Sequence, residues 1–179
     1  MKKNNVKTIT LTAVFAALIA VTTAFIKIPT GINEGYVHIG DSMIYLAGCL
    51  LGPYAAIAAS IGGALADLLA GAAVWVLPTA IIKPLNAIPF IIATHYYVKH
   101  KGSHKIIHLS TILMSVVSGF ITILGYYIAE GLMFSFEAAL IASPLGLIQP
   151  IGSAVVFIIV GFAFDKLNIQ KSLFKGDLK

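Results

Sequence analysis

The sequence has no arginine, a single cysteine and few charged side chains. Charged residues make up 11% of the 179 positions, whereas soluble domains carry about 25%. The formal net charge of +5 does not indicate nucleic-acid binding, because arginine is absent and no basic stripe carries interleaved aromatic residues. Cys49 has no second cysteine to pair with, so we exclude an internal disulfide and interpret Cys49 as a small buried residue.

Several motifs of enzymes and nucleotide-binding proteins are missing as well. The chain contains no glycine-rich nucleotide loop, no HExxH zinc-protease motif and no GxSxG elbow. His100, His104 and His108 are spaced four apart, but they begin in a lysine-rich segment that contains Gly102, which argues against a metal site. We therefore expect no catalytic residue, no metal ion and no cofactor, and any ATP hydrolysis has to come from a partner.

The sequence is instead rich in apolar residues. Hydrophobic residues make up 59% of the chain, and the mean hydropathy is +0.95, which indicates an integral membrane protein. About six helices of about 20 residues fit this length and leave no room for a soluble domain. We predict an all-α membrane protein, one domain over residues 1–179, built as a bundle of six transmembrane helices at about 8–28, 41–51, 53–71, 79–98, 107–130 and 143–164.

The predicted span at 41–51 is too short to cross a bilayer alone at 1.5 Å per residue. It is either tilted and extended by the 33–40 segment, or the bilayer is locally thinner there. The connections at 29–40, 72–78 and 131–142 are rich in glycine, proline, aromatic and acidic residues, and we predict that they lie on the outer side.

The lysines gather on one side of the predicted membrane. They precede the first span, join the fourth to the fifth, and follow the last: Lys2, Lys3, Lys7, Lys99, Lys101, Lys105, Lys166, Lys171, Lys175 and Lys179. Short cytoplasmic loops are rich in lysine, so both termini are predicted to be cytoplasmic in a multi-pass protein of the cell membrane. The acids of the outer half are Glu34, Asp41, Asp67, Glu130 and Glu137. We therefore look for function in this outer half.

Three ionisable residues inside predicted spans need an explanation, because a charge at the centre of a membrane helix costs about 2.5–3.5 kcal/mol on insertion scales. Asp67, Lys83 and Glu130 each lie near the outer end of a span, where they can face a shared cavity. An ion pair between Asp67 and Lys83 is an equally good structural explanation. Pro84 frees a backbone carbonyl one turn earlier, and Asn86 adds an amide, so a polar ligand would find several partners.

Aromatic and polar side chains surround this point in the predicted topology. Trp75, Tyr126, Tyr36, His38 and Gln149 combine rings with a few hydrogen-bonding groups, which suits a small planar heterocycle. An interfacial aromatic belt is the alternative, and it explains Trp75 and Tyr36 well. It explains Tyr126 and Gln149 less well.

Asp41 and Ser42 stand at the start of the predicted 41–51 span. Both residue types accept hydrogen bonds from the free amides of a first helical turn. We interpret Asp41 as a helix cap.

Small residues recur at four-residue spacing on the first span, with Ala13 followed by Ala17 and Ala16 followed by Ala20. This spacing aligns small side chains on one face and lets another helix approach closely. Association with a partner and packing inside the bundle are both consistent with the spacing.

Four segments together resemble the membrane-embedded S components of energy-coupling factor (ECF) transporters. They are residues 35–42 (GYVHIGDS), 46–53 (LAGCLLGP), 62–71 (GGALADLLAG) and 81–85 (IIKPL). The family pattern has an aspartate at the second helix, an LLGP turn, a glycine-rich third helix ending near Ala-Asp, and a lysine early in the fourth. The size and helix number of nearly the whole chain agree with this resemblance.

The resemblance implies a six-helix bundle that binds one vitamin or vitamin precursor near the outer face, under the first and third outer loops. It implies a partner coupling protein in the membrane and two ABC ATPases, with the bundle toppling on docking. The residues it assigns to docking are Ala13, Ala16, Ala17 and Ala20. The residues it promotes as ligand contacts are Lys83, Asn86, Trp75, Tyr126 and Glu130, beside the further candidates Asp67, Tyr36, His38 and Gln149.

Within the family, the pattern looks most like members linked to vitamin B6 or hydroxymethylpyrimidine, although Pro84-Leu85-Asn86 departs from the common pattern. Riboflavin, thiamine and queuosine precursors remain open. A strongly anionic substrate is disfavoured, because only Lys27 and Lys83 could neutralise it. Outside the family, the alternatives are an intramembrane enzyme and a proton-coupled transporter that uses Asp67 or Glu130 as proton carrier.

Overall fold

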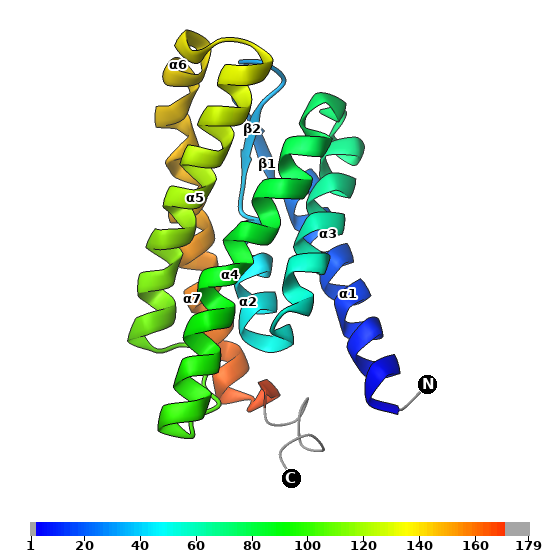
Figure 1. The fold of residues 1–179 in the computed structure, drawn as a ribbon, viewed down its shortest axis with the longest axis vertical. Coiled ribbons are helices and arrows are strands. Elements are labelled where there is room, and N and C mark those ends of the chain that lie inside the picture. The colour runs from blue at the N-terminus through cyan, green and yellow to red at the C-terminus, as the bar shows by residue number, and fades with distance from the viewer. Residues whose placement is uncertain (1–2, 171–179) are drawn as a thin grey trace.

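The computed structural model describes residues 3–170, and its long elements are all helices (Figure 1). The helices are α1 (Lys3–Phe25), α2 (Asp41–Leu51), α3 (Tyr54–Ala70), α4 (Val76–Lys101), α5 (Leu109–Met133), α6 (Phe136–Gly146) and α7 (Ile148–Lys166). A short 3-10 helix, η1 (Ala73–Trp75), precedes α4, and two short strands, β1 (Lys27–Pro29) and β2 (Tyr36–His38), form a hairpin between α1 and α2. Lys2, Lys171, Lys175 and Lys179 lie outside the described residues.

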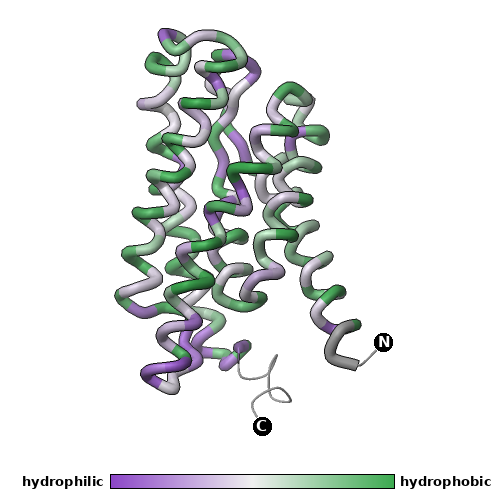
Figure 2. Tube along the Cα trace, in the orientation of Figure 1, coloured by the Kyte–Doolittle hydropathy of each residue, from purple (hydrophilic) through white to green (hydrophobic). Residues whose placement is uncertain are grey.

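Four helical segments within residues 3–170 are long and apolar enough to cross a membrane. They are Val6–Phe25, Ala73–Lys101, Leu109–Met133 and Ile148–Lys166, while α2 and α3 are shorter apolar helices. The structure therefore confirms a helical membrane protein, and the number of six spans stays a prediction. The start of α1, the connection between α4 and α5, and the end of α7 lie at one end of the bundle (Figure 1). We call this the inner end. Figure 2 shows hydrophilic residues gathered there, around the last turn of α4.

The connection predicted at 131–142 is largely helical. Helix α5 continues to Met133, and α6 begins at Phe136. The Ser135 hydroxyl accepts a hydrogen bond from the amide of Ala138 at 3.1 Å, so it satisfies one of the free donors of the first turn of α6. Helix α6 then packs against α5 and α7. The last helix that is long and apolar enough to cross a membrane accordingly runs from Ile148 to Lys166.

The short helix α2 forms the centre of the bundle. Ten of its eleven residues are buried, because α1, α3, α4 and α7 all pack on it. The Tyr45 ring stacks on Phe90 with a centroid distance of 4.4 Å, and Phe90 meets Phe157 edge-on at 5.1 Å. Gly52 ends the helix with a positive φ of 56°, a conformation that glycine adopts without steric cost. These rings belong to one buried apolar cluster that joins α2 to its neighbouring helices.

Helices α1 and α3 make the most extensive helix contact in the structure. Ala16 and Ala20 lie on the buried side of α1, and a Cβ on Gly62 of α3 would lie 2.5 Å from the Ala16 carbonyl oxygen. Ala13 and Ala17 are exposed. The four alanines therefore do not share one outward face, and only Ala13 and Ala17 remain candidates for partner docking.

Gly62→Ala tests this close approach. An alanine in the interior of a helix is favoured over glycine by about 1 kcal/mol, but overpacking a filled contact costs about 1–3 kcal/mol. We expect Gly62→Ala to lower the thermal unfolding midpoint in detergent. The matched control is Gly152→Ala in α7, where the nearest atom to a new Cβ is 3.6 Å away. We expect the control to keep or raise the midpoint, and equal midpoints for both variants would contradict the close α1–α3 contact.

Candidate functional site

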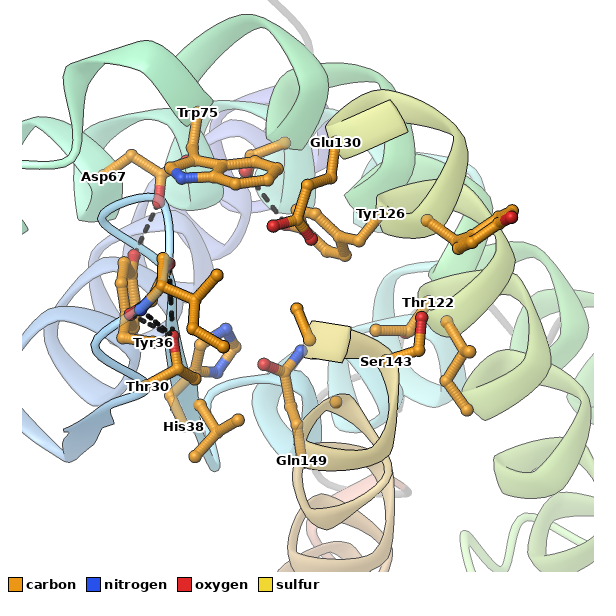
Figure 3. Close-up of a pocket in the computed structure, with 18 of the residues that line it drawn as sticks. Thr30, Tyr36, His38, Asp67, Trp75, Thr122, Tyr126, Glu130, Ser143 and Gln149 are labelled. Atoms are coloured by element: carbon orange, nitrogen blue, oxygen red, sulfur yellow. Dashed lines mark hydrogen bonds between the residues drawn. The ribbon is translucent and has the colours of Figure 1, made fainter. Parts of the chain in front are cut away.

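A cavity of about 100 Å³ lies at the outer end of the bundle, opposite the inner end defined above. The hairpin, α3, η1, α4, α5, α6 and α7 all contribute to its lining. Figure 3 shows the side chains around an open space, with Trp75 and Glu130 on one side and Gln149 on the other. The cavity brings together eight of the nine residues singled out from the sequence: Tyr36, His38, Asp67, Trp75, Lys83, Tyr126, Glu130 and Gln149.

Asn86 does not line the cavity. Its side chain is fully buried one turn below Lys83 on α4, where its amide donates to the Thr122 hydroxyl at 2.8 Å. Thr122 itself lines the cavity. Asn86 therefore contacts a side chain that lines the cavity, Thr122, but does not line the cavity itself.

The floor of the cavity is a buried ion pair between Lys83 and Asp41. The Lys83 ammonium lies 2.6 Å from Asp41 Oδ1, and the two side chains are 1% and 0% exposed. The Gln149 amide donates to the other carboxylate oxygen at 2.8 Å. Helices α4, α2 and α7 are thus joined at one carboxylate.

This arrangement corrects two interpretations made from the sequence. Lys83 pairs with Asp41, so the alternative of an ion pair between Lys83 and Asp67 is wrong. Asp41 is also not a helix cap: α2 has no side-chain cap hydrogen bond, because both Asp41 oxygens point to Lys83 and Gln149. A buried charge left without its partner would be far costlier than an uncapped helix end.

The carbonyl freed by Pro84 is also not available to a ligand. A proline removes the hydrogen bond to the carbonyl four residues earlier, which belongs to Ala80. That oxygen accepts a hydrogen bond from the Ser60 hydroxyl of α3 at 2.9 Å. The Ala80 carbonyl therefore has its hydrogen-bond partner within the bundle. The polar contacts that α4 offers to the cavity come from side chains.

Asp67 forms one wall together with the hairpin. The Tyr36 hydroxyl donates to Asp67 Oδ1 at 2.5 Å, and Asp67 Oδ2 is buried without a hydrogen-bond partner among residues 3–170. Lys27 does not reach this carboxylate. Its ammonium donates to the Ala70 carbonyl at 3.0 Å and lies 4.8 Å from the centre of the Tyr36 ring. One oxygen of a buried carboxylate is thus left as an acceptor.

The loop between β1 and β2 closes the cavity from outside. Asn33 Nδ2 donates to Glu130 Oε1 of α5 at 2.6 Å, and the Trp75 indole donates to the Asn33 carbonyl at 2.9 Å. Asn33 and Glu34 have positive φ angles of 47° and 57°, so the turn is tight and favours asparagine. Sequence reasoning missed Asn33, since nothing in its local sequence indicates a partner 97 positions away.

Aromatic rings and hydroxyl groups make up the remaining walls. Trp75 meets Tyr126 edge-on with a centroid distance of 5.7 Å, and the Tyr126 and Thr79 hydroxyls share a hydrogen bond of 2.9 Å. Sequence reasoning also missed the lining residues Thr79 and Thr122. Helical spacing could have found them, because they precede Lys83 and Tyr126 by four positions and so share a face with them.

His38 lies in the outer connection and is neutral. Its Nδ1 accepts a hydrogen bond from the Gly40 amide at 3.0 Å, so the ring proton resides on Nε2. Burial, followed by the nearby positive charge of Lys83, lowers the pKa of His38 to about 3. The ring therefore offers the cavity a neutral polar group at physiological pH.

The remaining histidines lie toward the inner end. His108 accepts a hydrogen bond from the Thr111 amide at the start of α5 and stacks on Tyr97 at 3.8 Å, which is a structural role. Within residues 3–170, no group of three or more histidine, cysteine, aspartate and glutamate side chains could hold a metal ion.

One comparison with known proteins identifies a transporter family, and two relatives carry names that state no function. A family model described as "ECF-type riboflavin transporter, S component" matches residues 3–166. A Pyrococcus woesei protein described as "Uncharacterized protein in gap 3'region" is 27% identical over 149 residues, which is 83% of this chain and 95% of that protein. A "UPF0397 protein" of Lactiplantibacillus plantarum is 35% identical over 75 residues, covering 41% of this chain and 40% of its own length.

Asn33→Asp tests the closure of the hairpin loop. Aspartate tolerates the positive φ, but it replaces a donor to Glu130 with a second carboxylate. Losing a hydrogen bond to a charged group costs about 1.5–3 kcal/mol, so we expect amide exchange in residues 30–36 to accelerate about tenfold or more. Adding Glu130→Gln to the same chain restores one donor and one acceptor. Exchange that stays equally fast in the double variant would contradict the Asn33–Glu130 contact.

Proposed function

The chain belongs to the S-component family of ECF-type transporters, and we propose that its substrate is a single-ring vitamin or precursor of the vitamin B6 or hydroxymethylpyrimidine type. Members of this family are vitamin-binding membrane subunits and not enzymes. In this proposal, the cavity at the outer end binds the substrate, and the hairpin loop covers it.

The size and lining of the cavity are the main support for the proposal. A cavity needs about 10–15 Å³ to hold one water molecule, so about 100 Å³ leaves room for several. This space suits one ring with a few small substituents. Ligand sites combine apolar and aromatic walls with a few convergent polar groups, and Trp75 and Tyr126 supply rings beside the acceptors Asp67 and Glu130.

The polar groups match the donors and acceptors of such a ring. Asp67 lines the cavity, and its buried Oδ2 has no partner among residues 3–170; in this proposal the carboxylate accepts from a hydroxymethyl or amino group of the ligand. Lys83 has two ammonium protons beyond the one that binds Asp41, and its nitrogen lies 5.2 Å from the centre of the Tyr126 ring. A ring nitrogen or hydroxyl oxygen placed against Tyr126 would accept from it.

Riboflavin is the second candidate, because the matching family model carries its name. Its three fused rings and ribityl chain need more space than a cavity of about 100 Å³ offers. In this proposal, binding riboflavin would require the hairpin loop to leave Glu130 and Trp75. The size of the cavity therefore favours the smaller ligand.

We propose that delivery to the inside uses a partner module. A transmembrane coupling protein bound to two ABC ATPases would dock on α1 at Ala13 and Ala17, the exposed pair of small residues. Small side chains allow close approach of a partner helix in a membrane. Docking would let the bundle topple, and ATP hydrolysis by the partners would reset it. Uptake that continued without the ATPases would instead favour a proton-coupled transporter.

Ligand binding is measured directly through Trp75, the single tryptophan of the chain, which lines the cavity. We expect saturable one-to-one quenching by pyridoxine or by hydroxymethylpyrimidine, and weaker binding of thiamine and riboflavin. Losing an aromatic wall costs about 0.5–1.5 kcal/mol beyond the area it buries, so Tyr126→Leu should weaken binding about tenfold or more. The matched control is Tyr96→Leu, at an exposed tyrosine near the inner end of α4. Tighter binding of riboflavin than of either small ring would overturn the substrate assignment.

The docking proposal has a separate test. Replacing Ala13 and Ala17 together by leucine adds bulk to the exposed face of α1. We expect this variant to bind substrate normally but to lose co-purification with the coupling protein and ATPases, and with it ATP-dependent uptake. Ala163→Leu, at an exposed position of α7, is the control. An intact complex with the double variant would show that another surface docks.

A further inference from the structure

We infer that Asp41 is a specificity-determining residue: by neutralising Lys83 at the floor of the cavity, it restricts the site to uncharged or cationic ligands and excludes anionic analogues. The inference rests on the proposed function, since it concerns the ligand of the same cavity. It assigns a role to Asp41, which lies behind the cavity and is absent from its lining.

The geometry of the pair shows that Asp41 neutralises the positive charge of Lys83. The ammonium lies 2.6 Å from Asp41 Oδ1, and both side chains are almost completely buried. Gln149 donates to the second oxygen at 2.8 Å, so the carboxylate is held from two helices and cannot turn away from Lys83 without losing both bonds. An ammonium has three donors, and only one is used by Asp41. Lys83 therefore offers hydrogen bonds to a ligand, but its positive charge is already matched.

Among the described residues, no second lysine lines the cavity beside its other acids. Lys83 is the one lysine among the lining residues in the described part of the chain, while Asp67 and Glu130 both line the cavity. Lys27 is directed to the Ala70 carbonyl and the Tyr36 ring, and His38 is neutral. A carboxylate on the ligand would meet two acids and a lysine that already has a counter-ion. Such a group is costly to desolvate without a matched charge.

The pair could instead serve only to join α2 to α4. The two roles differ in what a charge change at the pair does to ligand selectivity. A purely structural pair affects all ligands of one shape equally, whereas a selectivity pair changes the ratio between a neutral ligand and its anionic analogue. Pyridoxine and 4-pyridoxate form a suitable pair of probes, because they differ chiefly by a hydroxymethyl group replaced by a carboxylate.

The experiment is a calorimetric titration of the full chain in detergent with both probes, in wild type and in Asp41→Asn. We expect wild type to bind pyridoxine and to reject 4-pyridoxate. Asp41→Asn keeps the shape of the side chain and leaves Lys83 with an unmatched charge. A new charge-assisted hydrogen bond should then raise the affinity for 4-pyridoxate, relative to pyridoxine, about tenfold or more. Glu137→Gln, at an exposed acid on α6, makes the same charge change elsewhere and should leave the ratio unaltered.

A second variant covers the case in which Asp41→Asn does not fold. Gln149→Lys keeps Asp41 and places a second ammonium at its other oxygen, so the floor of the cavity gains a net positive charge with a carboxylate between the two cations. We expect the same increase in the 4-pyridoxate to pyridoxine affinity ratio. The double variant Asp41→Asn with Lys83→Gln carries no charge at the floor and should reject 4-pyridoxate as wild type does.

The outcomes separate this inference from the proposed function. If wild type binds neither probe, the vitamin B6 assignment fails, while new binding of 4-pyridoxate to Asp41→Asn or Gln149→Lys still supports the role of Asp41. Wild-type binding of 4-pyridoxate as tight as that of pyridoxine would overturn the inference. An unchanged affinity ratio in a folded Asp41→Asn or Gln149→Lys chain would overturn it as well.

Discussion

The buried ion pair between Asp41 and Lys83 is the interaction on which the rest of the outer half depends. A lone charge at this depth would be costly, since an ionisable side chain at the centre of a membrane helix costs about 2.5–3.5 kcal/mol on insertion scales. The attraction between Asp41 and Lys83 and the hydrogen bond from Gln149 offset this cost. The same contacts join α2, α4 and α7. Because α2 begins at Asp41, the same contact fixes where the preceding hairpin ends and therefore where the cover of the cavity lies.

The bundle contains a packed aromatic core toward its inner end and a cavity at its outer end. Toward the inner end, Tyr45, Phe90 and Phe157 pack as a compact aromatic core around the short helix α2. Toward the outer end, α2 is absent, and the space it leaves is bounded by longer helices and closed by the hairpin loop. The early end of the short central helix thus leaves space for a cavity among its neighbours. The contacts of Asn33 with Glu130 and Trp75 close that space.

Small residues at four-residue spacing lie on two different faces of α1. Ala16 and Ala20 are buried in the bundle, with Ala16 against Gly62 of α3, whereas Ala13 and Ala17 face outward. Spacing alone predicts that a face can approach a neighbour closely, but it does not say which neighbour. The rotation of the helix decides that, and it follows from packing against α2 and α3 rather than from hydropathy.

The sequence by itself determined the membrane class, the long apolar helices and the placement of most cavity residues near one end. These follow from composition, from the lysine distribution and from the cost of burying charge, all of which are local or one-dimensional properties. Only the tertiary structure decided that Lys83 pairs with Asp41 rather than Asp67, that Asn33 binds Glu130, and that Asn86 lies below the cavity. Each of these depends on helix rotation and on contacts between residues far apart in the chain, which no local pattern specifies.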